Sequence, residues 1–296
     1  MIVRLLAALL LIMPSLLQAV TIDELHNSGQ LAVSYTIVDK DAITQYQPVM
    51  MEIEVSTDRW FASGSRVERF DIQDAIVYRS SQTSTNSSRT VAGTTRALQL
   101  WTLVFYPQKS GALTIPKLRL FVSLNTEGNN IVEGYLTLDS QTITVNTPAA
   151  MNGVDHWLAA NNLTINERYD GLKDSYKPGD AITRTISLRI EGSPAMMLPA
   201  IEFPEQKGLA LYQVPPKVSE SSNRGQLIGT RVEQFIITIE AEGSYQLPGY
   251  QYYWWNLQSQ QQKLLALEPL AFATDGAGTA SVITEPGPLL KDYPGS

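Results

Sequence analysis

The sequence has no cysteine and only two histidines, His26 and His156. Without cysteine there is no disulfide scaffold and no thiolate nucleophile, so burial of apolar side chains must stabilise the chain. A serine nucleophile needs a base within reach, and a zinc ion needs three or four nitrogen or sulfur ligands. Two histidines far apart in the chain meet neither need, and no Gly-x-Ser-x-Gly turn or phosphate-binding glycine loop occurs. The sequence therefore predicts no enzymatic activity and no catalytic, cofactor-binding or metal-binding residue.

The carboxylates allow two weaker alternatives to a protein without functional sites, a calcium site and a glycosidase pair. Sandwich domains can bind calcium between domains through carboxylates. The candidate pairs are Asp39 with Asp41, Asp170 with Asp174, and Glu240 with Glu242. Such charges are typical of the solvated face of a strand, so calcium binding stays an alternative. Glu52 and Glu54 lie opposite core positions of one strand with no aromatic sugar platform nearby, which argues against a glycosidase.

The balance of charge is acidic, with 22 Lys and Arg against 29 Asp and Glu and a formal net charge of −7. A nucleic acid partner requires a basic face, which this composition does not favour. Nothing in the sequence points to a small-molecule substrate. We therefore predict neither nucleic acid nor a small molecule as the partner.

Long apolar runs are also missing beyond the first 19 residues, which have the pattern of a secretory signal. Arg4 supplies positive charge, Leu5 to Met13 form the apolar region, Pro14 and Ser15 end it, and Ala19 is the expected cleavage point. This run is too short to span a bilayer, which takes about 20 residues. We expect an exported protein, in the periplasm or at the periplasmic face of the inner membrane.

What the sequence does contain is one β unit used twice. Residues 96–123 and 231–256 share a glycine followed five positions later by a proline, Gly111 with Pro116 and Gly243 with Pro248. Apolar positions match at the same offset: Leu103 with Phe235, Phe105 with Ile237, Leu113 with Tyr245, and Ile115 with Leu247. A Tyr-x-Pro also occurs twice before a strand, at 46–48 and 176–178. The repeat predicts two domains of matched strand order.

Short strands with turns every 8 to 12 residues or so, and almost no helical periodicity, are typical of antiparallel sandwiches. We predict an all-β protein of two tandem immunoglobulin-like antiparallel β-sandwich domains with a short helical linker. A single closed antiparallel sheet is the alternative, and the repeat argues against it. The expected parts are a signal peptide at 1–19, an N-terminal sandwich at 20–147, a linker at 148–162 with a helix over 151–160, a C-terminal sandwich at 163–274, and a Gly/Pro-rich tail at 275–296. Residues 198–204 read as a short edge strand bounded by prolines.

Aromatic residues gather in 250–255, where every position except Gln251 is aromatic. Alternation on a strand places Tyr250, Tyr252 and Trp254 on one face and Tyr253 and Trp255 on the other. The first set aligns with core positions of the first copy. Large rings on the outer face of a sheet indicate a covered surface, so Tyr253 and Trp255 are the candidate partner-binding residues. Cover by the linker or by the neighbouring domain is the alternative.

The second half of the chain resembles the BatD family, the oxygen-tolerance proteins of Bacteroides-aerotolerance gene clusters. The residues that carry the resemblance are 157–158, 163–165, 178–186, 198–199, 208–212, 229–231, Gly243, 247–248 and 254–256. The first half is similar more loosely, through Gly111, 115–116 and the signal peptide. As a set these motifs are specific and cover about half of the chain; each alone is weak.

The resemblance implies an envelope protein with its bulk in the periplasm and no established enzymatic activity. Family members are typically encoded with von Willebrand factor A-domain proteins and a MoxR-type ATPase, and are linked to stress or oxygen tolerance. They usually carry a transmembrane helix after these domains. The tail at 275–296 ends without one, so membrane association is expected only through a missing or downstream anchor.

Two functional hypotheses follow. The first is a non-enzymatic interaction scaffold that acts with other envelope proteins, the A-domain proteins above all, by surface recognition or by strand pairing at a sheet edge. The second is a carbohydrate- or peptidoglycan-binding sandwich module, because aromatic platforms on acidic sandwiches suit that role as well.

Overall fold

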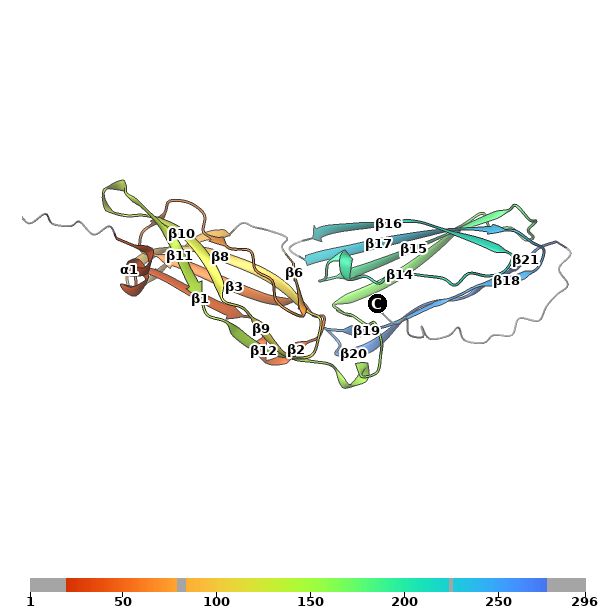
Figure 1. Ribbon diagram of the computed structural model, residues 1–296, viewed down its shortest axis with the longest axis horizontal. Helices are drawn as coiled ribbons and strands as arrows, with labels where there is room; N and C mark the ends of the chain where they lie inside the picture. Colours follow the sequence, from red (N-terminus) through yellow and green to blue (C-terminus); the bar gives the residue numbers. More distant parts are fainter. Residues whose placement is uncertain (1–19, 79–83, 224–225, 276–296) are drawn as a thin grey trace, which may run out of the picture.

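The computed structural model describes residues 20–78, 84–223 and 226–275 of the chain. The predicted signal peptide and nearly all of the predicted tail lie outside these residues. The described part is all-β and forms two antiparallel sandwiches that lie end to end (Figure 1). The predicted fold class is therefore confirmed. None of the helices in these three ranges is long and apolar enough to cross a membrane.

The N-terminal sandwich has two layers. The first layer is the sheet β1-β3-β8-β6, in which β7 pairs with the other part of β8. Its strands are β1 (Leu31–Ile37), β3 (Val49–Thr57), β6 (Ala75–Tyr78), β7 (Thr85–Val91) and β8 (Thr94–Pro107). The second layer is built from β10 with its neighbours β11, β4 and β5, and from β9, β12 and β2. Its strands are β2 (Ile43–Thr44), β4 (Trp60–Phe61), β5 (Arg66–Val67), β9 (Gly111–Ile115), β10 (Leu118–Asn125), β11 (Ile131–Leu138) and β12 (Gln141–Asn146). The short helix α1 (Ile22–Asn27) and the 3₁₀ turns η1 (Lys40–Ala42) and η2 (Glu127–Asn129) complete it.

Alternation along the strands builds the N-terminal core. On β3, Val49, Met51, Ile53 and Val55 are buried, while the residues between them face outward. They meet β10, whose Leu120 and the apolar residues two positions on either side of it face the same interior. All buried residues of this core lie between residues 22 and 145.

The C-terminal sandwich repeats this plan. One layer is the sheet β14-β15-β17-β16, and the other is formed by the sheet β13-β19-β20 and the pair β18-β21. The strands are β13 (Ala159–Ala160), β14 (Asn162–Asp170), β15 (Ala181–Glu191), β16 (Leu209–Asn223), β17 (Gln226–Ile239), β18 (Ser244–Leu247), β19 (Tyr250–Asn256), β20 (Gln261–Leu267) and β21 (Leu270–Ala273). The 3₁₀ turns are η3 (Ala149–Met151) and η4 (Ala195–Met197). The buried residues of this core lie between residues 158 and 265.

The predicted repeat corresponds to equivalent strands. Pro116 separates β9 from β10, and Pro248 separates β18 from β19, because proline has no N–H to donate to a ladder. The matched apolar positions lie on β8 and β17 and on β9 and β18, and all except the half-buried Tyr245 are buried. Each sandwich also contains a short parallel pairing near its Tyr-x-Pro segment. This pairing joins β2 with β12 in the N-terminal sandwich and Tyr176 with Thr274 in the C-terminal one.

Two local predictions differ from the structure. The linker helix is one 3₁₀ turn at Ala149–Met151, and residues 159–160 instead form the strand β13, because pairing with β19 satisfies their backbone groups. Residues 198–206 form no strand, since Pro199 and Pro204 withhold two of the N–H groups that a ladder needs.

Candidate functional site

Strand β19 places its aromatic side chains on two faces, as the alternation predicts. Tyr250, Tyr252 and Trp254 are buried in the C-terminal core. Trp255 points to the opposite face, yet only 8% of it is exposed. Tyr253 on the same face is half-buried. The two predicted partner-binding residues are therefore not equally accessible, and the reason lies in the linker.

The linker covers Trp255. Met151, Trp157, Ala159 and Trp255 form a small apolar cluster of buried residues, which we call the linker cluster. The half-buried Tyr46, Val154, Tyr253 and Leu257 pack against it. Backbone bonds hold the linker in place, since the Trp255 N–H donates to the Leu158 carbonyl over 2.9 Å and β13 pairs in parallel with β19. The buried indole N–H of Trp255 has no hydrogen-bond acceptor, so the Trp255 side chain, unlike its backbone, is held there by packing alone.

The linker cluster also joins the two sandwiches. The ring of Tyr46, which follows β2 of the N-terminal sandwich, meets the Trp157 ring edge to face at 4.8 Å. On the other side of the linker, the side-chain amide of Gln262 on β20 donates to the Ala150 carbonyl over 3.1 Å. One apolar cluster thus contacts both sandwiches and the segment between them.

A second contact between the sandwiches is polar. The Tyr78 hydroxyl on β6 donates to one oxygen of the Glu220 carboxylate on β16 over 2.5 Å, and the other oxygen accepts the Ala195 N–H over 2.9 Å. Beside it, the Tyr106 hydroxyl donates to the Gly192 carbonyl over 3.2 Å. In Figure 1, the end of β6 faces the ends of β16 and β17. We call these bonds the tyrosine contact, and together with the linker cluster they form the joint between the sandwiches.

The electrostatics of the tyrosine contact keep both hydroxyls as donors. Burial first, and then the hydrogen bond and the negative charge of Glu220, raise the pKa of Tyr78 to about 12. Burial also raises the pKa of Tyr106. Gly192 has φ 85, a conformation that favours glycine, and a Cβ there would lie 2.9 Å from the Asn161 side chain. The contact therefore depends on a glycine as well as on two tyrosines.

The histidines and paired carboxylates do not come together. His26 on α1 hydrogen-bonds the Leu31 carbonyl through Nδ1 over 3.1 Å, and His156 is exposed in the linker. Of the carboxylates considered for calcium, Asp170 pairs with Arg168, and all six are exposed. Glu54, the glycosidase candidate on β3, pairs with Arg89. Within residues 20–78, 84–223 and 226–275, no group of three or more His, Asp or Glu side chains is placed to hold a metal ion.

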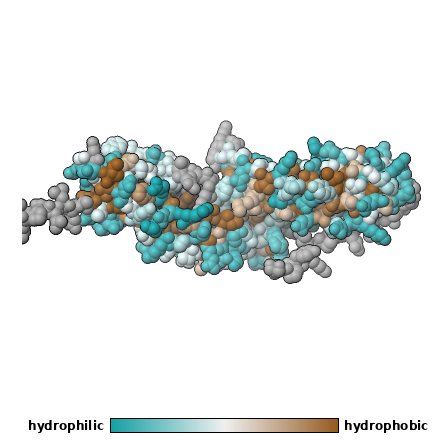
Figure 2. All heavy atoms as spheres, turned by 45° about the horizontal axis from the view of Figure 1, so that its top comes forward, coloured by the Kyte–Doolittle hydropathy of each residue, from teal (hydrophilic) through white to brown (hydrophobic). Residues whose placement is uncertain are grey.

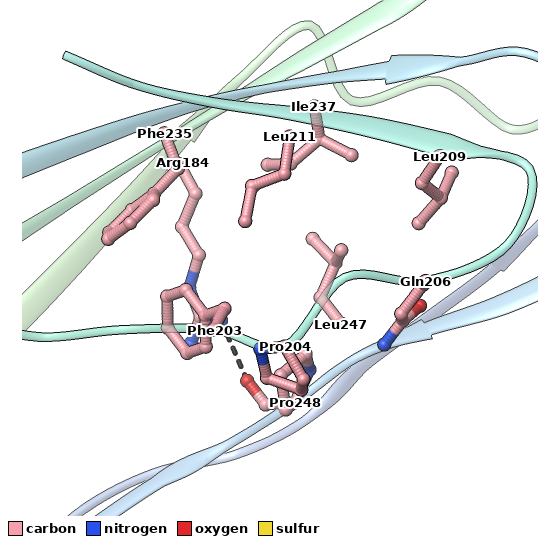
Figure 3. Close-up of a pocket in the computed structure, with 10 residues that line it drawn as sticks. All are labelled: Arg184, Phe203, Pro204, Gln206, Leu209, Leu211, Phe235, Ile237, Leu247 and Pro248. Atoms are coloured by element: carbon pink, nitrogen blue, oxygen red, sulfur yellow. Dashed lines mark hydrogen bonds between the residues drawn. The ribbon is translucent and has the colours of Figure 1, made fainter.

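A small cavity in the C-terminal core is lined by Arg184 and Gln206 together with apolar residues of both layers (Figure 3). Its volume of about 20 Å³ holds one water molecule and not an organic ligand. Arg184, 1% exposed, donates from Nε to Glu167 over 3.0 Å and from Nη1 to the Pro248 carbonyl over 2.7 Å. Its guanidinium lies 4.6 Å from the centre of the Phe203 ring. These contacts give Arg184 a structural role, because they tie β15 to β14, to the turn between β18 and β19, and to the segment 198–206.

Sequence reasoning missed the tyrosine contact and the role of Arg184. Tyr78 and Glu220 lie far apart in the chain, and neither belongs to a motif. Arg184 lies within 178–186, one of the segments that resemble BatD, and nothing in that segment indicates its partners. The Tyr-x-Pro at 46–48 was a usable signal for the linker cluster, since its tyrosine is the ring that meets Trp157.

Comparison with known proteins adds a family. Residues 36–147 match the BatD family model, described as a BatD DUF11 like domain. The match confirms the resemblance to BatD, although it covers less than half of the chain and falls on the N-terminal sandwich, where the resembling residues were fewer. No curated protein matches the chain. A solved structure named BspA_C_mut is 6% identical and covers 82% of this chain and 98% of that chain, with a TM-score of 0.20, too low to support an argument about fold.

Proposed function

We propose, from the match of residues 36–147 to the BatD family model, that this chain is a non-enzymatic envelope protein that acts as a scaffold for other envelope proteins. The BatD match is the observation that carries the proposal. The family resemblance extends it to the periplasm, to von Willebrand A-domain proteins that act with a MoxR-type ATPase, and to stress or oxygen tolerance. In this proposal the protein works by presenting surfaces, and it transforms no substrate.

The arrangement of the sandwiches supports this role. Two separate contacts, the linker cluster and the tyrosine contact, join the units end to end. An elongated pair of sandwiches with a fixed joint holds surfaces on both units at a defined separation, which a scaffold needs. Domains in one chain otherwise move relative to each other unless their interface is extensive.

The proposed partner surface beside the joint is centred on Tyr253. Its neighbour across the pair β19-β20 is Leu264, which is 48% exposed. Trp255 then contributes indirectly, because it holds the linker beside this surface. Of the two residues predicted from the sequence, we propose that Tyr253 contacts the partner and that Trp255 supports it.

Affinity purification tests the proposal. The mature chain with a terminal tag is incubated with envelope extract, and the bound proteins are identified by mass spectrometry. We expect A-domain proteins to be enriched, and we expect Tyr253→Ser to lower their yield severalfold while the variant still unfolds in one cooperative transition. Tyr212→Ser is the matched control, because Tyr212 is an exposed strand tyrosine on the other layer. Absence of A-domain proteins from the bound fraction would remove the partner assignment. Equal yields for both variants would show that Tyr253 does not contact the partner.

Cell-wall sedimentation tests the alternative. A scaffold stays in the supernatant when purified chain is mixed with isolated peptidoglycan, whereas a peptidoglycan-binding module enters the pellet. Saturable sedimentation of the mature chain would favour the binding module.

A further inference from the structure

Apolar side chains reach the surface at several separate places (Figure 2). One place combines large exposed side chains with positive charge, on the outer face of β10 and its neighbours in the N-terminal sandwich. Two rows of paired residues cross this face: Trp60, Asn125 and Ile131 in one, and Arg66, Phe121 and Tyr135 in the other. The alternate residues of β10 fill the core, so these side chains must face outward. We call Trp60, Arg66, Arg119, Phe121, Ile131 and Tyr135 the arginine face.

Trp60 is 76% exposed, whereas each of the other four tryptophans is at most 8% exposed. Ile131 is 60% exposed and Tyr135 is 43% exposed. Single exposed apolar residues are ordinary, but here three large ones share one sheet face. Tryptophan, tyrosine and arginine are also the residues that most often dominate the energy of protein interfaces.

Stacking holds the arginine face in order before any partner arrives. The Arg66 guanidinium lies 4.2 Å from the centre of the Phe121 ring, and the Arg119 guanidinium lies 4.2 Å from the centre of the Tyr135 ring. The two rings meet edge to face at 5.4 Å. Side chains already held in one geometry lose less conformational entropy on binding.

Two charged groups of this face, Arg66 and Glu133, have no ion pair within the described part of the chain. Arg119 pairs with Glu68 over 3.1 Å, and Glu133 on the same face accepts the Ser123 hydroxyl over 2.8 Å. Within the described ranges, Arg66 has neither an ion pair nor a hydrogen bond from its guanidinium and is exposed. Most other described arginines do have a carboxylate partner, namely Arg59, Arg89, Arg119, Arg168, Arg184, Arg189 and Arg231. An unpaired arginine on an acidic chain complements a carboxylate brought by another molecule.

We propose that the arginine face docks an acidic segment of a partner protein. The carboxylate of that segment pairs with Arg66, and its apolar side chains cover Trp60 and Ile131. A protein fits better than a membrane, because the exposed groups lie across a sheet face. The inference rests on the proposed scaffold function and names the chemistry of one of its partners. The surface is separate from the one around Tyr253.

Trp60 itself reports on the test, because acrylamide in solution reaches this exposed indole far more readily than the four buried ones. The mature chain is titrated with a soluble peptide of alternating glutamate and leucine, and separately with its lysine counterpart. We expect the glutamate peptide to protect Trp60 from quenching and the lysine peptide to give no protection. Arg66→Glu should lower the affinity for the glutamate peptide at least tenfold. Arg168→Glu, which changes an exposed arginine on β14, should leave its affinity within twofold.

Any one of three results would overturn the proposal. Either the glutamate peptide gives Trp60 no protection, or both peptides protect it equally, or Arg66→Glu and Arg168→Glu lower the affinity for the glutamate peptide equally. Vesicles of phosphatidylglycerol that protect Trp60 when the peptide does not would assign the face to a membrane. A dimer in light scattering that Trp60→Ser converts to a monomer would assign it to a second copy. Because the titration uses purified components, its failure leaves the enrichment of A-domain proteins as a separate result.

Discussion

The outer faces of β10 and β19 occupy equivalent places in the two sandwiches, and they have different surroundings. Phe121 and Tyr253 correspond at the same offset as Gly111 and Gly243, and Ser123 corresponds to Trp255 in the same way. The linker strand β13 pairs with the end of β19, as β4 pairs with the end of β10. The linker thus covers the outer face of one sandwich and leaves its counterpart open. A repeated fold can use one copy of a face for assembly of the chain and the other for a partner.

The interiors differ at an equivalent position as well. Met51 on β3 lies opposite Leu103, and Arg184 on β15 lies opposite Phe235, the matched residue of the repeat. Both Met51 and Arg184 are buried. The N-terminal sandwich has β4 and β5 beside β10, whereas residues 198–206 of the C-terminal sandwich form no strand. Arg184 bonds Glu167 on β14 and the carbonyl of Pro248 and lies over the Phe203 ring, so a side chain rather than strand pairing ties the segment 198–206 to the sandwich.

The largest expected effect concerns this interior difference. Arg184→Met makes the C-terminal core resemble the N-terminal one, yet it leaves Glu167 and a backbone carbonyl without their partner. Breaking a buried ion pair typically costs about 3 to 5 kcal/mol of unfolding free energy, and we expect about 4 kcal/mol here, because the Pro248 carbonyl loses its donor as well. Urea unfolding of the mature chain measures it.

The control for this prediction is Met51→Leu, which conserves volume and should cost less than about 1.5 kcal/mol. Adding Glu167→Gln to Arg184→Met should recover part of the loss, because the remaining carboxylate is then uncharged. If Arg184→Met were as stable as the parent chain, the tethering role of Arg184 would be wrong.

The next effect concerns the covered face. Trp255→Ala removes the ring that the linker packs against, and loss of a buried tryptophan typically costs about 3 kcal/mol. We expect this variant to be destabilised and to show a wider range of shapes in small-angle X-ray scattering. Trp255→Phe is the matched control. It keeps an aromatic ring and removes an N–H that has no acceptor, so its cost should be much smaller. Equal losses for both variants would show that the indole N–H matters.

How far the sequence leads depends on whether the determining contact is local. The alternation on β19, the prolines that divide β9 from β10 and β18 from β19, and the repeat are all local, and each predicted its strands. The faces of Tyr253 and Trp255 were also predictable. Cover by the linker was one of the alternatives for Trp255, but the sequence could not choose it, because it depends on where a linker without strong periodicity pairs. Tyr78 with Glu220, and Arg66 over Phe121, are contacts between distant segments whose partners no spacing indicates.

A smaller effect is expected at the tyrosine contact. Tyr78→Phe removes one hydrogen bond to a carboxylate, and its exposed setting limits the cost to about 1 kcal/mol. The joint should loosen more than the sandwiches do, so scattering should report a broader distribution of shapes with almost unchanged thermal unfolding. A double-mutant cycle with Glu220→Gln isolates the pair. A coupling energy of zero would mean that the linker cluster alone fixes the joint.

The smallest effect is a pH dependence of that contact. The pKa of Tyr78 is raised to about 12 in the folded chain, first by burial and then by Glu220, above the usual value of 10.0. Its folded form therefore keeps the proton that the unfolded chain releases, so this stabilisation is complete below pH 10 and is lost as pH rises toward 12. Absorbance of ionised tyrosine, taken as the difference between the parent chain and Tyr78→Phe, follows that single titration. In Glu220→Gln the Tyr78 midpoint should move down toward its usual value without reaching it, because burial remains. An unchanged midpoint would show that Glu220 does not act on Tyr78.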